Sequence, residues 1–167
     1  EGKKVNVERF DIQRIRDAVQ HASAMNSKGL NIYACVNPAN GSKILPGKAA
    51  SDDHIHRAHF AFADCDEMGV AENLINNAPQ FDFCVVTGSI PHLRCHYYWQ
   101  FLAPVSNLSE WTNLQKMLAA KHASDPQVCN PSRIMRVAGT IAFPSNKKKQ
   151  QGYTIELTHM KGAKRLC

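Results

Sequence analysis

The pattern of apolar and polar positions along the chain predicts helices alternating with mainly short strands. Apolar residues follow helical spacing from Phe10 to Met25, and the polar segment 26–29, which ends in glycine, stops that helix. Val70–Ala78 is expected to be a second, shorter helix. A third helix is predicted from Ser109, as its N-cap residue, to about Ala123, because its apolar side chains gather on one side.

The remaining apolar segments are short and bounded by turn residues, which is typical of strands. They are Leu30–Val36, Ala58–Asp66, Phe81–Thr87, Arg94–Leu102, Ile134–Val137, Thr140–Phe143 and Tyr153–Leu157. The stretch Ser42–Asp53 contains proline, glycine and polar residues and is expected to be a loop. Helices combined with mainly antiparallel strands predict an α+β fold, and 167 residues suit one domain with its own core.

The expected strand Ala58–Asp66 ends in two carboxylates separated by one residue. Side chains alternate along a strand, so Asp64 and Asp66 would point the same way, with Cα atoms about 7 Å apart. Two such carboxylates repel each other and lose hydration unless a cation lies between them. Mg²⁺ or Mn²⁺ fits best, because these ions take oxygen ligands and in pairs support nucleotidyl transfer. The alternative is an acidic turn before Gly69.

A second group of polar residues follows the turn Thr87-Gly88-Ser89. Beyond it, His92, Arg94, His96 and Tyr98 alternate with mostly apolar residues, which predicts a strand with one polar, basic face. Imidazoles, a guanidinium and the Ser89 hydroxyl on such a face can bind phosphate oxygens. A structural role for a single histidine is the alternative, but several buried basic groups without an anion would be costly.

A third group lies between Asp125 and Thr140. Asp125 follows the end of the third expected helix, and Arg133 and Arg136 lead into the Gly139-Thr140 turn. Taken locally, Asp125 could be a turn residue before Pro126, and the two arginines could be partners in surface ion pairs.

Positive charge is concentrated toward the C-terminus. Residues 1–129 hold 12 Lys and Arg against 13 Asp and Glu, whereas residues 130–167 hold 8 Lys and Arg against Glu156 alone. A segment of this kind, with Lys147, Lys148 and Lys149 in a row, suits a polyanion such as nucleic acid, although a solvated basic surface is the alternative. The six cysteines have no zinc-site spacing, and we find neither a signal peptide nor a membrane-spanning stretch, so we expect no zinc and a cytoplasmic location.

Together these groups resemble the archaeo-eukaryotic primase superfamily, and most closely the primase-polymerase domains of plasmid and phage replication proteins. The resemblance covers approximately Asn31 to Leu157. It rests on Asp64-Cys65-Asp66, on Thr87-Gly88-Ser89 with His96-Tyr97-Tyr98-Trp99, and on the stretch from Arg133 to Thr140. The third metal-binding carboxylate of the family would fall on Asp125. Ala138 departs from the pattern, because a proline often precedes the glycine in this group.

The resemblance implies an RNA-recognition-like antiparallel sheet core with flanking helices, and template-directed nucleotidyl transfer on single-stranded DNA. Asp64, Asp66 and Asp125 would hold two Mg²⁺ or Mn²⁺ ions. The nucleoside triphosphate would be bound by Ser89, Arg94, His96, Arg133 and Arg136, and the template backbone by Lys147, Lys148 and Lys149. Residues 1–167 would then be a single catalytic domain excised from a longer replication protein, in which a helicase domain could follow.

Two other functions are considered. His54-Ile55-His56 matches the His-hydrophobic-His pattern of rolling-circle replication nickases, which attack DNA with a tyrosine. That interpretation leaves Asp64 and Asp66 without a role. A noncatalytic nucleic-acid-binding module is the second alternative, and it predicts that replacing Asp64 by alanine leaves function intact.

Overall fold

The main sheet of the protein has four strands, joined in antiparallel pairs. The computed structural model describes residues 6–77 and 80–162. Its main sheet has the order β2-β4-β3-β8, and its strands are β2 (Ala58–Cys65), β3 (Phe83–Gly88), β4 (Arg94–Val105) and β8 (His159–Gly162). Two smaller antiparallel pairs join β1 (Tyr33–Cys35) to β5 (Ile134–Arg136) and β6 (Ile141–Ala142) to β7 (Glu156–Leu157). The predicted α+β fold is confirmed.

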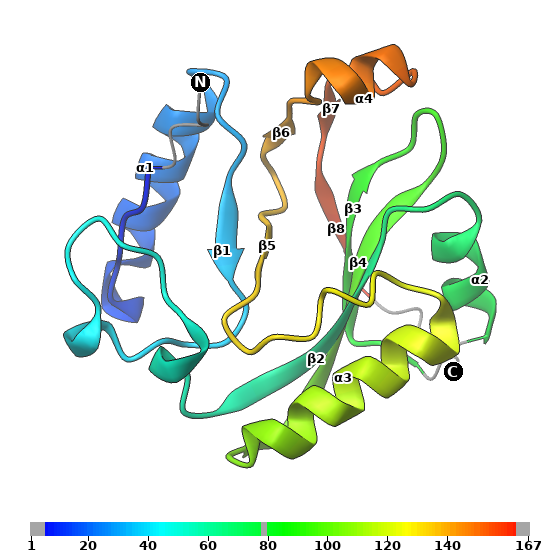
Figure 1. Ribbon diagram of the computed structural model, residues 1–167. Coiled ribbons are helices and arrows are strands. Elements are labelled where there is room, and N and C mark those ends of the chain that lie inside the picture. Colours follow the sequence, from blue (N-terminus) through cyan, green and yellow to red (C-terminus); the bar gives the residue numbers. More distant parts are fainter. Residues whose placement is uncertain (1–5, 78–79, 163–167) are drawn as a thin grey trace.

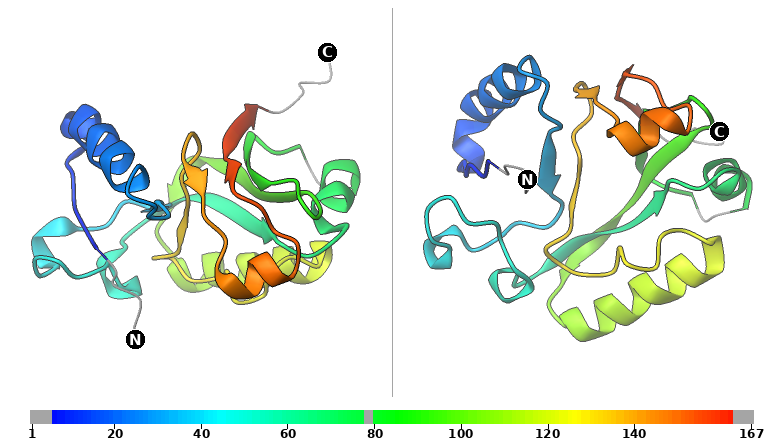
Figure 2. Two further views of the ribbon diagram at one scale, coloured as in Figure 1. Left: turned by 90° about the horizontal axis from the view of Figure 1, so that it is seen from above. Right: turned by 45° about the horizontal axis from the view of Figure 1, so that its top comes forward.

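The order of elements around the main sheet is that of a split β-α-β arrangement. Strand β2 is followed by α2 (Val70–Asn77), β3, β4 and α3 (Leu108–His122), and β4 lies between β2 and β3 in the sheet. Figures 1 and 2 place α1 (Ile15–Asn26) and the segment 37–57 on the far side of the β1–β5 pair from this sheet. The RNA-recognition-like core with flanking helices is therefore present.

Side chains of helix α3 form hydrogen bonds with the backbone of β2 along the edge that has no neighbouring strand among the described residues. The Gln115 side chain, which is buried, accepts a hydrogen bond from Phe62 N (3.2 Å) and donates one to Phe62 O (2.9 Å). Trp111 Nε1 donates to Phe60 O at 2.9 Å. Because an edge strand exposes unpaired backbone groups, these side chains act as a neighbouring strand would. The edge that leads to Asp64 is thereby held in place.

Apolar side chains pack on both faces of the main sheet. On one face, Cys65, Cys95 and Tyr97 pack with Leu74 of α2. On the other face, Phe62 and Tyr98 belong to a cluster with Val85, Trp111 and Met135. The alternation predicted for β4 is correct, but its polar face is shorter than expected. Tyr98 is buried and stacks on Phe83 with ring centroids 4.6 Å apart, so Arg94 and His96 are the predicted members of that face that remain polar and lie in the strand.

Several predicted boundaries differ from the structure. The first helix has a 3-10 turn at Ile12–Arg14 before α1 begins at Ile15, because the Asp11 side chain caps that turn. Ser109 is not the N-cap of α3; Asn107 is, and its Oδ1 accepts from Glu110 N at 3.2 Å. The predicted strand Leu30–Val36 is reduced to β1, and β4 extends to Val105. Ala78, the predicted end of the second helix, lies outside the described residues.

One α-helix and one strand were not predicted from the sequence. One is the short helix α4 (Asn146–Gln150), whose N-cap Ser145 accepts a hydrogen bond from Lys148 N. The other is β8, which pairs with the edge of β3. The lysine run in α4 has no apolar periodicity, and β8 is exposed throughout, so neither has the pattern on which the predictions depended.

Candidate functional site

A pocket of about 230 Å³ opens between the main sheet and the segments that contain β1, β5 and α4. Its charged and aromatic lining includes Asp64 and Asp66 from β2 and the turn after it, Arg94 and His96 from β4, Arg136 from β5, and Lys148 and Tyr153. A larger, shallow pocket of about 440 Å³ lies elsewhere, beside Asp52 and the start of α3. The Asp52 carboxylate is already hydrogen-bonded to Ser132 and Asn130. We therefore take the pocket that contains Asp64 and His96 as the candidate site.

Asp64 and His96 are direct cross-strand partners at the floor of this pocket. Their Oδ1 and Nε2 atoms are 3.5 Å apart, and within the described residues Asp64 Oδ1 is buried without a hydrogen-bond partner. Burial, with the nearby charges of Asp66 and Asp125, raises the pKa of Asp64 to about 7. Burial also lowers the pKa of His96 to about 4. At neutral pH the His96 imidazole is therefore uncharged, and the Asp64 carboxyl beside it is close to its own pKa.

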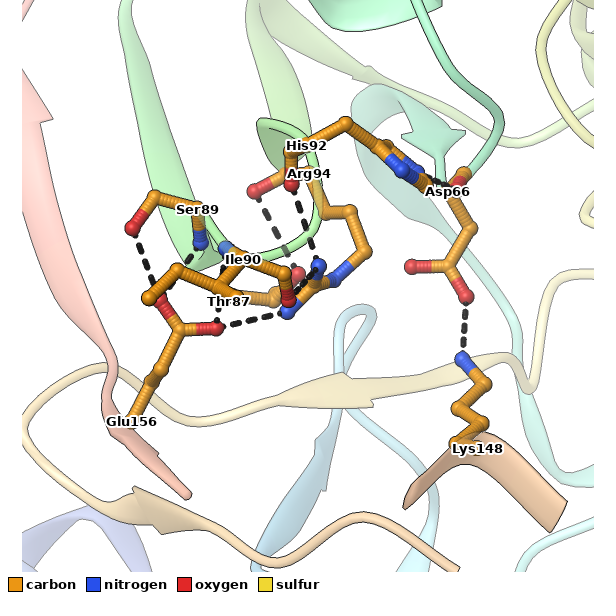
Figure 3. Close-up of polar contacts among 8 residues, drawn as sticks. All are labelled: Asp66, Thr87, Ser89, Ile90, His92, Arg94, Lys148 and Glu156. Carbon is orange, nitrogen blue, oxygen red and sulfur yellow. Dashed lines mark hydrogen bonds and ion pairs between the residues drawn. The ribbon is translucent and has the colours of Figure 1, made fainter. Parts of the chain in front are cut away.

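Asp66 follows the end of β2 and already has a cationic partner. Lys148 Nζ lies 2.6 Å from Asp66 Oδ2 (Figure 3). The main-chain oxygen of Asp66 is 2.8 Å from His92 Nε2, which fixes the turn after β2 to the turn before β4. His92 is thus held outside the strand and away from the polar face that it was predicted to share.

Ser89 and Arg94 contact Glu156 of β7 (Figure 3). Glu156 accepts hydrogen bonds from Ser89 N (2.6 Å), Ser89 Oγ (2.8 Å) and Ile90 N (3.3 Å), and Arg94 Nη2 is 2.8 Å from its Oε1. These donors and the ion pair lower the pKa of Glu156 despite its burial. The sequence predicted that Ser89 and Arg94 meet an anion, and in the structure they meet this carboxylate.

The close approach of Arg94 and Glu156 leaves no room for a side chain at Gly88. A Cβ atom there would lie 1.8 Å from Arg94 Nη2 and 2.5 Å from Glu156 Oε1. Any larger residue would therefore displace the ion pair between β4 and β7.

Asp125 and Arg133 lie beside the site and are not part of the pocket lining. Asp125 N donates to Asp64 O at 2.9 Å, which continues the capped edge of β2, while Asp125 Oδ1 accepts from Gln127 N at 2.8 Å. Arg133 donates to Gln127 O. The structure thus brings Asp125 next to Asp64 through the backbone, and its role as a third metal ligand stays a prediction.

Arg136 lines the pocket and is held by neutral groups. Its Nη1 donates to Asn31 Oδ1 (2.6 Å) and its Nη2 to the Tyr33 hydroxyl (2.9 Å), and its guanidinium lies 4.9 Å from the centre of the Tyr33 ring. Because neither partner is acidic, its positive charge remains available in the pocket.

Several residues of the site were not identified from the sequence; among them, Asn31, Tyr33 and Tyr153 line the pocket, and Glu156 binds Arg94 in its wall. Only Glu156 had a signal, as the single acidic residue among the basic residues after position 129. Lys148 was expected to bind template with Lys147 and Lys149, but those two are exposed and Lys148 turns to Asp66.

The residues of the pocket suit a hard divalent cation. Asp64 and Asp66 present carboxylate oxygens, and among the described residues Asp64 Oδ1 is buried without a hydrogen-bond partner. The ammonium of Lys148 already lies beside Asp66, at a place where a cation is favoured. Within residues 6–77 and 80–162, no group of three or more His, Cys, Asp and Glu side chains lies together in a way that could hold a metal ion. The fit to Mg²⁺ or Mn²⁺ therefore rests on the two carboxylates of the pocket, with substrate phosphates supplying further oxygens.

The histidine pair of the nickase interpretation is not among the residues that line this pocket. His54 Nδ1 lies 2.7 Å from Ser51 Oγ and accepts from Ser51 N at 3.0 Å, as part of a capping box on the 3-10 turn Asp52–His54. This nitrogen is already hydrogen-bonded to the backbone of Ser51.

Among the described helices, none combines the length and apolar character that crossing a membrane requires.

Comparison with solved structures finds one with the same architecture. The chain is similar to the AEP domain of the primase-polymerase (PrimPol) of cyanophage S-2L, with a TM-score of 0.62 and 26% sequence identity. The match covers 86% of this chain and 68% of that one. No family model matches the sequence, and no curated protein matches it either.

Proposed function

Because this chain belongs to the archaeo-eukaryotic primase superfamily, we propose that it is a DNA primase-polymerase of a phage or plasmid replication system. It would make or extend primers on single-stranded DNA, using nucleoside triphosphates. One observation carries the proposal: Asp64, Asp66, His96 and Arg136 surround one pocket, in a fold that matches a primase-polymerase domain.

Asp64 and Asp66 would hold the divalent ions, with Asp125 as the proposed third carboxylate. When bound, such ions activate a primer 3′-hydroxyl and stabilise the leaving pyrophosphate. The contribution of this chain would be to keep two carboxylates close together at the end of β2, where their mutual repulsion favours cation binding. The hydrogen bonds from α3 to β2 and from Asp125 to Asp64 hold that edge in register.

His96 and Arg136 would bind the triphosphate from two sides of the pocket. The Nδ1 atom of His96 is buried without a partner among the described residues, so an imidazole N–H can donate to a phosphate oxygen. Arg136 supplies a permanent charge and a planar set of donors. Ser89 and Arg94 could bind the triphosphate only if their hydrogen bonds to Glu156 were replaced by hydrogen bonds to phosphate. Arg133 would first have to break its hydrogen bond to Gln127 O.

Primer synthesis and primer extension on single-stranded DNA with Mg²⁺ or Mn²⁺ test this proposal. Wild type should form product, the Asp64→Ala/Asp66→Ala variant should form none, and His96→Ala should weaken triphosphate binding while template binding persists. Product from the double-aspartate variant would exclude the proposed metal site. A stable tyrosine-linked DNA adduct would instead identify a nickase. DNA binding by wild type and Asp64→Ala alike, with no product from either, would identify a noncatalytic binding module.

A further inference from the structure

Lys148 occupies an unusual place among the three consecutive lysines of α4. Its ammonium lies 2.6 Å from Asp66 Oδ2 and 5.0 Å from the centre of the Tyr153 ring, so a carboxylate and an aromatic face hold it at the pocket. Lys147 and Lys149, on either side, are exposed. One charge of the basic segment is therefore directed at the candidate metal site, while its neighbours are directed at solvent.

The segment that carries Lys148 is fixed at its other end as well. Glu156 binds Arg94 and the backbone of the 89–90 turn (Figure 3). The Arg94 guanidinium also lies 4.5 Å from the centre of the Tyr153 ring. Residues 145–156, here called the α4–β7 segment, thus contact Asp66 at one end and the β3–β4 turn at the other. This double attachment keeps the Lys148 ammonium close to Asp66.

We propose that Lys148 is a resident counter-ion of Asp66, which a divalent cation displaces and which then pairs with the phosphates of the incoming nucleotide. The inference rests on the proposed function, because it assigns the displaced charge to a nucleotide at the same pocket. Lys148 is in this sense a positioning residue that links occupation of the metal site to occupation of the nucleotide site.

The physical reason is competition for one oxygen atom. An ammonium and a divalent ion in contact with the same oxygen, Asp66 Oδ2, would repel each other strongly, so an ion that coordinates this oxygen displaces the ammonium. When a triphosphate is present, the released ammonium gains a new anionic partner, and the cost of breaking the pair is offset. Coupling of this kind is reciprocal between the two ligands.

Binding of Mn²⁺ alone to the full chain, followed by electron paramagnetic resonance, tests the first half of the inference. Removing the competing charge in Lys148→Met should tighten Mn²⁺ binding by about three- to tenfold. Lys147→Met and Lys149→Met remove the same charge from the same helix and should leave the affinity within about twofold of wild type, because neither contacts Asp66. Lys148→Arg keeps a cation near Asp66 and should bind Mn²⁺ nearly as wild type does.

Nucleoside triphosphate binding at saturating Mg²⁺ tests the second half. Lys148→Met should bind the nucleotide about three- to tenfold more weakly than Lys147→Met or Lys149→Met. The inference is overturned if Lys148→Met binds Mn²⁺ no more tightly than these controls, or if it binds nucleotide as they do. Tighter Mn²⁺ binding in a chain that makes no primer would retain the counter-ion role and reject the primase-polymerase. Primer synthesis with unchanged Mn²⁺ binding would do the reverse.

Discussion

Asp64 is the residue at which the proposed function and the stability of the fold oppose each other. Its carboxyl is buried at the end of β2, close to Asp66 and Asp125, and these surroundings raise its pKa from 3.8 to about 7. The unfolded chain ionises this group near its ordinary pKa, so the folded state binds more protons between about pH 4 and pH 7. In the absence of metal, Asp64 therefore reduces stability progressively as the pH rises through that range, and reduces it fully above pH 7.

Asp64→Asn should accordingly stabilise the metal-free protein. The gain should be small at pH 4.5 and reach about 2–4 kcal/mol at pH 8, because an amide has no charge to desolvate. Urea unfolding in the presence of a chelator, at both pH values, measures it. Asp53→Asn replaces an exposed aspartate and should show no comparable gain. If Asp64→Asn is no more stable than wild type at pH 8, the buried Asp64 carboxylate does not destabilise the folded state.

At the scale of elements, the attachment of β7 to the β3–β4 turn depends on one carboxylate. Glu156 accepts four hydrogen bonds, from Ser89, Ile90 and Arg94, and the Arg94 side chain is only 6% exposed. Removing one partner of such a pair leaves a buried charge without compensation.

Glu156→Gln should therefore destabilise the protein by about 2–4 kcal/mol, since the amide cannot neutralise Arg94. Chemical unfolding at neutral pH measures the loss. Glu67→Gln, at an exposed position after β2, is the matched control and should change stability by less than about 0.5 kcal/mol. If both variants unfold alike, Glu156 does not hold the α4–β7 segment in place.

The long strands of the main sheet were predicted closely, whereas the short elements were predicted too long or missed, for a physical reason. Strands β2, β3 and β4 could be predicted because their apolar residues alternate between two packed faces. Strands β6 and β7 were predicted as the longer segments Thr140–Phe143 and Tyr153–Leu157 but have two residues each, and α4, which was not predicted, has five. Elements this short show no period, and contacts such as Ser145 with Lys148 and Glu156 with Ser89 determine their position. The α3 cap was misplaced because two capping residues, Asn107 and Ser109, stand close together.

At the scale of the whole molecule, the pocket is assembled from segments far apart in the chain. Asn31, Asp64, His96, Arg136 and Tyr153 line it together. The sequence indicated the chemistry of the acidic pair and of His96, since spacing within one strand shows which side chains share a face. It could not show that Arg136 would be held by Asn31 and Tyr33, or that Lys148 would reach Asp66, because those contacts depend on how the β1–β5 pair and α4 meet the sheet.

Asp64 costs stability in the absence of metal, and we propose that its carboxylate is nevertheless required for metal-dependent nucleotidyl transfer. Primer extension by Asp64→Asn, with wild type under the same Mg²⁺ and Mn²⁺ concentrations, tests it most directly. The variant should remain folded, at least as stable as wild type at pH 8, and yet extend a primer at least about a thousandfold more slowly, because a neutral amide cannot supply the charge that balances the divalent ions. Extension at a rate close to that of wild type would show that nucleotidyl transfer does not depend on the Asp64 carboxylate.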